Sequence, residues 1–564
     1  MAGCPIPIGV DDFEKMIQNG YYYVDKTRLI QELLDKKGEV NLFTRPRRFG
    51  KTLNMSMLRC FFEDCGSKEE NQKRRDLFKD TLIMQADESC LAHMTAYPVI
   101  SLSLKSAKQP DFETAYYCLQ KEISREFIRH RHVLNDLITE EDKRRFEAIM
   151  NAQGSTRDDA TALQFLSDCL FHVYGQKTII LIDEYDVPLE NAYYNGFYDE
   201  MVTFLRSLFE SALKTNPSLQ FAVLTGCLRI SRESIFTGLN NLNLISILSS
   251  QYDEYFGFAQ PEVDELLTRY GMSDKADIVK QWYDGYLFGN ANVYNPWSVI
   301  NYIQETSSGG DGIPRPYWSN TSSNSIVKDL IEHANLEIRS ELETLIAGGS
   351  IEKQIHEDIT YDAIYGSEDN LWNFLLFTGY LKRSGSRVEQ EIQYETMAIP
   401  NLEIRYIYKN TILTWFDQKL KKQDLTPFYR ALDSGDTDTM EEILSSILSE
   451  TISFYDSQEG YYRGFLAGLL RGNGKYIVTS NRESGDGRPD LILRTQVVRK
   501  GRAIILEIKV ADRYQNMETK AKEALEQIHH QKYRKDLENI GFVDILEYGI
   551  CFWKKEAIVR KYPD

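Results

Sequence analysis

The sequence predicts an α/β protein with a parallel sheet covered on both faces by helices, followed by a helical middle region and a second, smaller α/β domain. Thr178–Asp183 and Leu219–Thr225 are continuous apolar runs, as expected of strands buried on both faces. Between them, apolar residues recur at helical spacing from Phe197 to Ala212. Strands that alternate with helices are typical of a parallel sheet.

The remaining elements follow from the same patterns. Strands are expected at Glu39–Thr44 and Pro98–Ser103, and the polar, helical stretch over about 106–175 is interpreted as an insertion between strands. From about 255 to 445 the pattern is helical with loops, and Ser307–Pro316 is a break. Mixed α/β signals return near the C-terminus: strands at Tyr476–Ser480, Asp490–Leu493 and Ala503–Glu507, then a helix at Lys520–Tyr533.

Composition limits the classes of protein to consider. No run of 18 uncharged apolar residues occurs, and the start of the chain lacks a secretory signal pattern, so we expect a soluble cytoplasmic protein without a membrane partner. The eight cysteines are scattered, which favours reduced thiols over a disulfide framework. The net charge of −18 argues against extensive wrapping of duplex DNA. It does not exclude a nuclease, because bound metal ions change the local charge.

A phosphate-binding loop is predicted at Thr44–Thr52, whose sequence is TRPRRFGKT. Gly50, Lys51 and Thr52 match the end of the Gly-x-x-x-x-Gly-Lys-Ser/Thr pattern between a strand and a helix. Backbone amides at the helix start would surround phosphate oxygens, the lysine would reach the β- and γ-phosphates, and the hydroxyl would bind Mg²⁺. Arg45 stands where the pattern has its first glycine. The remaining loop residues, which complete the predicted nucleotide site, are Arg47, Arg48 and Phe49.

A second element supports this prediction. The apolar strand Thr178–Asp183 ends in Asp183 and Glu184, at the strand end where ligands bind in open α/β sheets. We expect Asp183 to hold Mg²⁺ through water and Glu184 to polarise the attacking water. A solvated strand end is the alternative for either carboxylate alone.

Three polar residues lie at the end of the next buried strand or shortly after it. Thr225 ends that strand, where its hydroxyl could sense the γ-phosphate. Arg229 and Arg232 could contact phosphate in cis or across a subunit interface, which leaves a homo-oligomer open. Surface ion pairs are the alternative for both arginines.

A metal-dependent nuclease site is predicted near the C-terminus. Asp490 follows Pro489, and Glu507 and Lys509 lie on an apolar strand 17 residues later. Residues i and i+2 share one face of a strand, so this carboxylate and this amine point the same way, an arrangement that is costly unless it is paired or binds metal. Asp490, Glu507 and the main-chain carbonyl of Ile508 would bind Mg²⁺ (or Mn²⁺), and Lys509 would orient the water.

Two more residues are assigned to this site. Glu459, at the start of a predicted helix, could add a metal-binding carboxylate, and Gln527, on a basic helix, could orient the site or contact the phosphate backbone. A Glu-x-Lys triplet alone is common, and an inactive fold used only for binding is the alternative.

A series of motifs runs through about 1–300: YYVDKT, RPRRFGKT, YPVISLS, LIDEYDVPL, LTGCLRISRESIFTGLNN, WYDGYLFG and VYNPWS. Together they resemble the AAA-ATPase-like family common in anaerobic bacteria. The family carries the same arginine-rich loop, so the resemblance implies an ATP-binding P-loop NTPase core despite Arg45. It also implies a helical or winged-helix region after the core.

Further segments within 455–555 are YYRGFLAGLL, VTSNRESGDGRPDLIL, AIILEIKVA and ALEQIHHQKY. These C-terminal motifs resemble the PD-(D/E)XK nuclease superfamily. The resemblance implies a restriction-endonuclease-like α/β fold acting on nucleic acid, with DNA favoured over RNA. Glu483 and Arg488 flank Asp490 in the matched motif. Relatives often carry His at the position of Arg463, to which no role is assigned.

The expected organisation has four parts: a P-loop ATPase core at 1–240, a helical, winged-helix-like region at 241–345, a helical connector at 346–450 and a nuclease-like domain at 451–564. The expected function is an ATPase that regulates a Mg²⁺-dependent nuclease, with defence against phage or mobile DNA as a hypothesis. Two alternatives stay open. One is a non-catalytic, ATP-dependent switch or scaffold, and the other is a nuclease with a degenerate P-loop.

Overall fold

The computed structural model divides the chain into two compact units. Unit 1 comprises 1–323 and 350–407, and unit 2 comprises 324–349 and 408–564. Helix α18 (Leu402–Lys422) begins in unit 1 and continues into unit 2. The structure describes residues 4–137, 139–214, 216–228, 235–236, 239–320, 327, 335–357, 367–422, 424–449, 459–471, 474–480, 489–498, 501–531 and 533–562.

The predicted parallel sheet is present in unit 1. Its strand order is β2-β3-β4-β1-β5, and every neighbouring pair is parallel. The strands are β1 (Val40–Thr44), β2 (Val99–Ser103), β3 (Thr178–Asp183), β4 (Leu219–Gly226) and β5 (Leu242–Ile245). Every residue of β1 and β3 is buried, as their apolar sequences predict. Because the strands are parallel, their carboxyl ends meet at one edge of the sheet.

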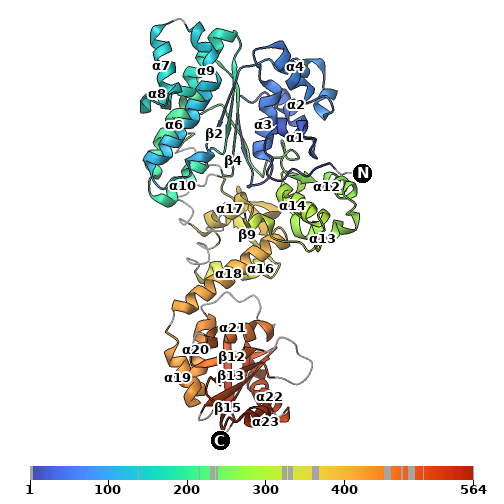
Figure 1. The fold of residues 1–564 in the computed structure, drawn as a ribbon, viewed down its shortest axis with the longest axis vertical. Helices are drawn as coiled ribbons and strands as arrows, with labels where there is room; N and C mark the ends of the chain where they lie inside the picture. The colour runs from blue at the N-terminus through green and yellow to red at the C-terminus, as the bar shows by residue number, and fades with distance from the viewer. Residues whose placement is uncertain are drawn as a thin grey trace. The chain divides into compact units, whose positions relative to one another are not determined.

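Helices cover both faces of this sheet. Figure 1 shows α6 to α9 on one side of the sheet and α1 to α4 on the other. Helices α6 to α9 fall within the stretch expected to be helical between β2 and β3. The helices of this part are α1 (Phe13–Gln18), α2 (Arg28–Lys36), α3 (Lys51–Phe62), α4 (Lys68–Asp76), α5 (Glu88–Leu91), α6 (Phe112–Arg129), α7 (Glu140–Met150), α8 (Thr156–Ala160), α9 (Ala162–Tyr174), α10 (Val187–Asn195) and α11 (Tyr198–Leu213).

A smaller layer of unit 1 follows the parallel sheet in the chain. It contains the helices α12 (Gln260–Arg269), α13 (Ala276–Tyr283) and α14 (Pro296–Ser307). A three-stranded antiparallel sheet accompanies them, in the order β6-β8-β7, with bounds β6 (Phe258–Ala259), β7 (Tyr286–Phe288) and β8 (Ala291–Tyr294). The three helices share one apolar cluster, which includes Val263, Val279 and Tyr302. This layer supplies α14 to the cavity described below.

The structure differs from the expected helical connector at 346–450. Besides α17 (Glu368–Thr378), this segment contains an antiparallel sheet in the order β10-β11-β9. Its strands are β9 (Ser350–Gln354), β10 (Lys382–Glu389) and β11 (Ile392–Ala398). The β10–β11 turn consists of Gln390 and Glu391, both with positive φ (47° and 69°). Such turns normally carry Gly, Asn or Asp, so the usual sequence signal of a hairpin is missing here.

Unit 2 is built on a five-stranded mixed sheet in the order β12-β13-β14-β15-β16. Only the β14–β15 pair is parallel among the pairs in this sheet. The strands are β12 (Tyr476–Ser480), β13 (Leu491–Thr495), β14 (Arg502–Val510), β15 (Asp544–Trp553) and β16 (Glu556–Lys561). The helices are α16 (Leu336–Ile346), α19 (Thr426–Ser434), α20 (Thr437–Ser449), α21 (Glu459–Arg471), α22 (Met517–His530) and α23 (Tyr533–Ile540). Helices α19 and α20 lie on one side of the sheet and α22 and α23 on the other (Figure 1).

Two features bear on the expectations drawn from composition. All eight cysteines carry free thiols, and four of them are buried. Across the described ranges of the chain, no helix combines the length and apolar character needed to cross a membrane.

Candidate functional sites

The loop from β1 to α3 forms the first candidate site. Gly50 precedes α3 with φ of 83°, a left-handed conformation that glycine adopts without strain. Arg48 also has a positive φ, of 70°. The loop therefore turns sharply twice before the helix starts at Lys51. The first amides of a helix have no carbonyl partner within the helix, so its start favours an anion.

Asp183 joins the loop to the neighbouring strands. Thr52 Oγ1 donates a hydrogen bond to Asp183 Oδ2 at 2.7 Å, and Thr225 Oγ1 donates to Asp183 Oδ1. This arrangement follows from the strand order, because β4 lies between β1 and β3 and ends at the same edge. Lys51 Nζ donates to the carbonyl oxygens of Arg45 and Pro46, each at 2.8 Å. The four side chains predicted for this centre therefore come from three adjacent strands and their loops.

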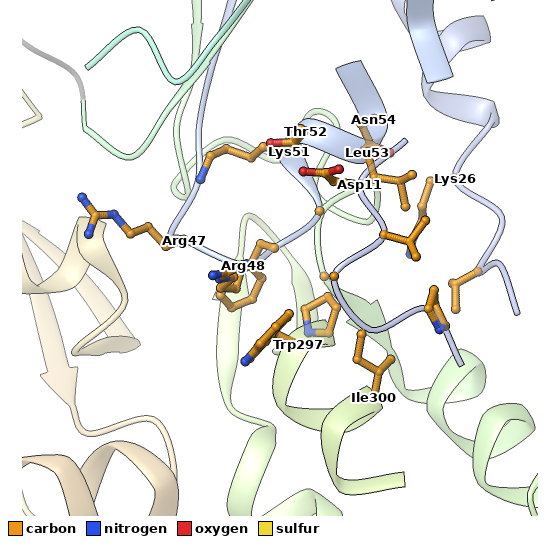
Figure 2. A pocket seen from close by; sticks show the side chains of 18 of the residues that line it. Asp11, Lys26, Arg47, Arg48, Lys51, Thr52, Leu53, Asn54, Trp297 and Ile300 are labelled. Carbon is orange, nitrogen blue, oxygen red and sulfur yellow. The ribbon is translucent and has the colours of Figure 1, made fainter. Parts of the chain in front are cut away.

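A cavity of about 370 Å³ opens beside this loop. Figure 2 shows Lys51 and Thr52 at the start of α3, with Arg48 beside Trp297 on α14. The Arg48 guanidinium lies 4.3 Å from the centre of the Trp297 ring. The basic lining residues are Lys26, Arg47, Arg48, Lys51, Lys105 and Lys108. Apolar and aromatic lining residues include Pro7, Val10, Tyr22, Tyr23, Val24, Pro296, Trp297 and Ile300. The cavity thus offers cations for phosphate and apolar surface for a base.

The second candidate site lies where β13 and β14 pair in unit 2. Leu491 of β13 stands opposite Leu506 of β14, so Asp490 comes close to Glu507. The Asp490 amide donates to Glu507 Oε2 at 3.3 Å, and the Ile508 amide donates to Asp490 Oδ2 at 2.9 Å. Asp490 and Glu507 are 7% and 3% exposed. Two carboxylates therefore share one buried position.

Lys509 and Gln527 lie next to this pair. Lys509 Nζ is 3.9 Å from Glu507 Oε1, consistent with the shared strand face that the sequence predicts. Gln527 Nε2, on α22, donates to the same oxygen. Burial, and then repulsion by Asp490, raises the pKa of Glu507 to about 7. Four of the residues predicted for the nuclease site thus meet in one cluster.

Comparison with known proteins also separates the part of the chain that holds the first site from the part that holds the second. Residues 7–236 match a family model described as "Predicted AAA-ATPase", and residues 457–562 match one described as "PD-(D/E)XK nuclease superfamily". The chain carries an AAA-ATPase-like domain and a PD-(D/E)XK nuclease superfamily domain. A protein of Azotobacter chroococcum mcd 1, described as "Uncharacterized protein in vnfD 5'region", is 25% identical over 422 residues, which cover 73% of this chain and 70% of that protein.

In the AAA-ATPase-like domain, Arg45 turns out to be structural. Its side chain is fully buried and donates to the carbonyl oxygens of Thr44 and Ile245, at 3.0 and 2.9 Å. Its guanidinium stacks 5.3 Å from Phe256 and 5.2 Å from Phe288. Burial lowers the pKa of Arg45 to about 9. The residue that replaces the expected glycine therefore anchors the loop to β5 and the aromatic core.

The three residues after Pro46 have different surroundings. Arg47 forms an ion pair with Glu190 of α10, and its carbonyl accepts a hydrogen bond from Trp318 Nε1 at 3.3 Å. Arg48 stacks on Trp297, as described above. Phe49 is 1% exposed and packs its ring against Tyr286, 4.9 Å away. Arg47 and Arg48 thus place their positive charges at the cavity, whereas the buried Phe49 ring anchors the loop.

Glu184 lies at the wall of the same cavity with φ of 53°. Its left-handed backbone turns the chain directly after β3. Burial and the neighbouring Asp183 raise the pKa of Glu184, whereas Lys51 and Lys105 lower it. Arg229, Arg232, Glu483 and Arg488, which the sequence analysis also considered, lie outside the described residues.

In the nuclease superfamily domain, the structure places Arg463 at the site, although the sequence analysis assigned it no role. This residue of α21 places NH1 3.1 Å from Asp490 Oδ1. Glu459, one helical turn earlier, is exposed, and its charge contributes to the raised pKa of Glu507. The role of Glu459 as a metal ligand stays a prediction.

The donor sets can be tested against the ions that the two families imply. At the first site, the hydroxyl of Thr52 and the carboxylate of Asp183 are hard oxygen donors at one point, which suits Mg²⁺. At the second site, Asp490 and Glu507 also offer hard carboxylate oxygens beside one another, which suits the same ion, although Arg463 and Lys509 already face them. No group of three or more His, Cys, Asp or Glu side chains able to hold a metal occurs in the part of the chain that the structure describes. Asp490, Glu507 and a main-chain oxygen such as that of Ile508 are therefore the available set.

The sequence analysis did not assign Lys105 and Lys108 to the site, although their position in the sequence gives a signal for them. Both follow β2, and both line the cavity together with Lys51. Two lysines directly after a buried parallel strand lie at the ligand-binding edge of the sheet. Trp297 and Ile300 had no such signal, because only tertiary packing brings α14 to the P-loop.

Proposed function

We propose that this protein is a nuclease controlled by its ATPase domain. The observation that carries the proposal is that each domain gathers its own phosphate-handling residues. Thr52 and Thr225 both donate to Asp183 in unit 1, and Asp490, Glu507 and Lys509 meet in unit 2. An ATPase–nuclease fusion agrees with both family matches.

In the ATPase domain, the triphosphate would lie at the start of α3. Lys51 would leave the carbonyls of Arg45 and Pro46 and bind the β- and γ-phosphates. Thr52 and Asp183 would hold Mg²⁺, which neutralises phosphate charge when bound. Glu184 would orient the attacking water, and Thr225 would hold Asp183 in place. Lys105 and Lys108 would add positive charge near the γ-phosphate.

In the nuclease domain, Asp490 and Glu507 would hold a divalent ion, Mg²⁺ or Mn²⁺, which lowers the pKa of bound water and stabilises charge on the phosphate. Lys509 would orient the water or take its proton, since its amine lies beside Glu507. Gln527 would fix the orientation of the Glu507 carboxylate through its hydrogen bond. Glu459 would add its carboxylate to the ligands of the ion when the ion binds.

The proposal also covers the substrate, the cellular location, the oligomeric state and the biological role. DNA is the favoured substrate over RNA, a cytoplasmic location fits the composition, and a homo-oligomer is compatible with the P-loop domain. A role in defence against phage or mobile DNA rests on the pairing of the two domains alone.

Two variants test the proposal. Full-length protein is assayed on single- and double-stranded DNA and RNA with Mg²⁺ or Mn²⁺, next to Lys509→Ala. Loss of the amine is expected to slow cleavage by about 100-fold or more. Lys475→Ala, in which a lysine paired with Asp433 on the same domain is removed, serves as the matched control and should cleave normally.

Equal cleavage by the wild type and Lys509→Ala would contradict the catalytic assignment. Substrate binding without cleavage by the wild type would favour a switch or scaffold. For the ATPase half, Lys51→Ala should weaken ATP binding, and an unchanged affinity would favour a nuclease with a degenerate P-loop.

A further inference from the structure

The carboxylates of the nuclease site already have protein partners. Asp490 Oδ2 accepts from the Ile508 amide, and Glu507 Oε2 accepts from the Asp490 amide. Gln527 and Lys509 stand at Glu507 Oε1. The remaining oxygen, Asp490 Oδ1, faces the guanidinium of Arg463 at 3.1 Å. The cluster is thus complete as a hydrogen-bonded, charge-paired group.

The amide and guanidinium partners of these carboxylates differ in whether they leave room for a metal ion. An amide hydrogen uses one lone pair of a carboxylate oxygen and leaves others for a cation. A guanidinium brings a full positive charge that proteins do not remove by deprotonation. An ion bound at about 2.1 Å from a carboxylate oxygen would lie a few ångströms from that charge. Arg463 and a divalent cation therefore repel each other at Asp490.

We propose that Arg463 is an internal cation that competes with the metal for Asp490, so that the ion must displace the arginine from this carboxylate. The inference rests on the proposed nuclease function and adds the control of metal entry to it. It makes Arg463 a positioning residue, because it acts on Asp490 and not on the scissile bond.

The surroundings of Arg463 allow this exchange. Its side chain is 23% exposed, so the guanidinium can reach solvent without leaving the edge of the site. The next residue, Gly464, has open space where a side chain would be, so the helix surface beside Arg463 is not blocked. Glu459 lies four residues earlier on α21, at the spacing at which oppositely charged side chains meet on a helix. A displaced Arg463 thus has another counter-charge within reach.

The test measures metal binding directly. The Mn²⁺ affinity of the full chain is determined without nucleic acid, by calorimetry or by the loss of the electron paramagnetic resonance signal of free Mn²⁺. Arg463→Ala should bind Mn²⁺ about tenfold more tightly than the wild type, because the competing charge is gone. Arg463→Lys, which keeps a charge but loses the planar fork, should fall between them.

A matched control is available in the same domain. Arg502 also pairs with an aspartate, Asp544, at 2.7 Å, and its side chain is 29% exposed. Arg502→Ala should leave the Mn²⁺ affinity unchanged, and circular dichroism checks that each variant is folded.

The outcomes separate the inference from the function on which it rests. Unchanged or weaker Mn²⁺ binding by Arg463→Ala would overturn the competition while leaving the metal site intact. If neither protein binds Mn²⁺, or if Asp490→Asn binds as well as the wild type, the proposed metal site fails and the inference fails with it.

Discussion

At the residue scale, Thr225 is joined to Asp183 at the first candidate site. It is 1% exposed, and its hydroxyl donates to Asp183 on the neighbouring strand. Thr225→Val removes this donor while keeping the shape, so Asp183 is free to turn away from Thr52. We expect ATP hydrolysis to fall by about 10- to 100-fold with little change in ATP affinity, measured by phosphate release and by calorimetry.

Thr178→Val provides the comparison for this variant. Thr178 is a buried threonine at the opposite end of β3, where its hydroxyl donates to Ser167 O at 3.4 Å. Its substitution should leave hydrolysis unchanged. Equal rates in the wild type and Thr225→Val would remove Thr225 from the mechanism.

The raised pKa of Glu507 predicts how metal binding at the second candidate site depends on pH. Its pKa is raised to about 7, mainly by burial and then by Asp490, and the carboxyl must lose its proton to bind a cation. Mn²⁺ affinity should therefore be about tenfold lower at pH 6 than at pH 8. Titrations at the two pH values check this. An affinity that does not change between them would show that Glu507 is not a ligand.

The same pKa has a consequence for the metal-free protein. Because the folded-state value lies above the ordinary value of 4.5, the contribution of Glu507 to stability is fully present below about pH 4.5. It is lost progressively as the pH rises through 7. Bound metal should reverse this trend, since it favours the ionised carboxylate.

At the residue scale, sequence reasoning succeeded where one strand sets the geometry. Glu507 and Lys509 share a face of β14, and this was predictable from their spacing alone. Arg463 and Trp297 could not be placed, because each reaches its site through the packing of a helix from elsewhere in the chain. No local pattern encodes such a contact.

At the scale of elements, the packing of α22 on β15 determines where Gln527 lies. A Cβ on Gly549 of β15 would come within 2.3 Å of Ala521 O on α22. Gly549→Ala should therefore push the helix away, destabilise the domain by about 1–3 kcal/mol and weaken the Gln527–Glu507 contact. Denaturant unfolding and hydrogen exchange of the α22 amides measure both effects.

A glycine on another helix supplies the control. Gly464 of α21 has open space around its Cβ position, and alanine favours a helix over glycine by about 1 kcal/mol. Gly464→Ala should leave stability unchanged or raise it. Similar losses in the two variants would mean that close approach to α22 is not what Gly549 provides.

Strands and helices differed in how well the sequence predicted them. The strands β1, β3 and β4 were predictable because buried parallel strands are continuous apolar runs. The hairpin β10–β11 was not, because its strands are mostly polar and its turn residues, Gln390 and Glu391, carry no turn signal. Sequence patterns thus identified the elements that bury apolar surface and missed those held mainly by backbone pairing.

At the scale of the whole molecule, helix α18 belongs to both units of the chain. Trp297 lines the ATPase cavity, and the adjacent Ser298 donates to the buried carboxyl of Glu403 at 2.8 Å. Glu403 lies in the first turn of α18, which continues into unit 2. This hydrogen bond lies within unit 1 and joins the cavity helix α14 to α18, so it is a place where the proposed control of the nuclease could begin.

The most direct test of this account compares cleavage with ATP, with ADP and without nucleotide, in the wild type and in Lys51→Ala. Cleavage by the wild type should depend on which nucleotide is present. Lys51→Ala should cleave at one rate under all three conditions, because its P-loop no longer holds the triphosphate. A wild-type rate that is the same with ATP, ADP and no nucleotide would contradict control of the nuclease by the ATPase domain.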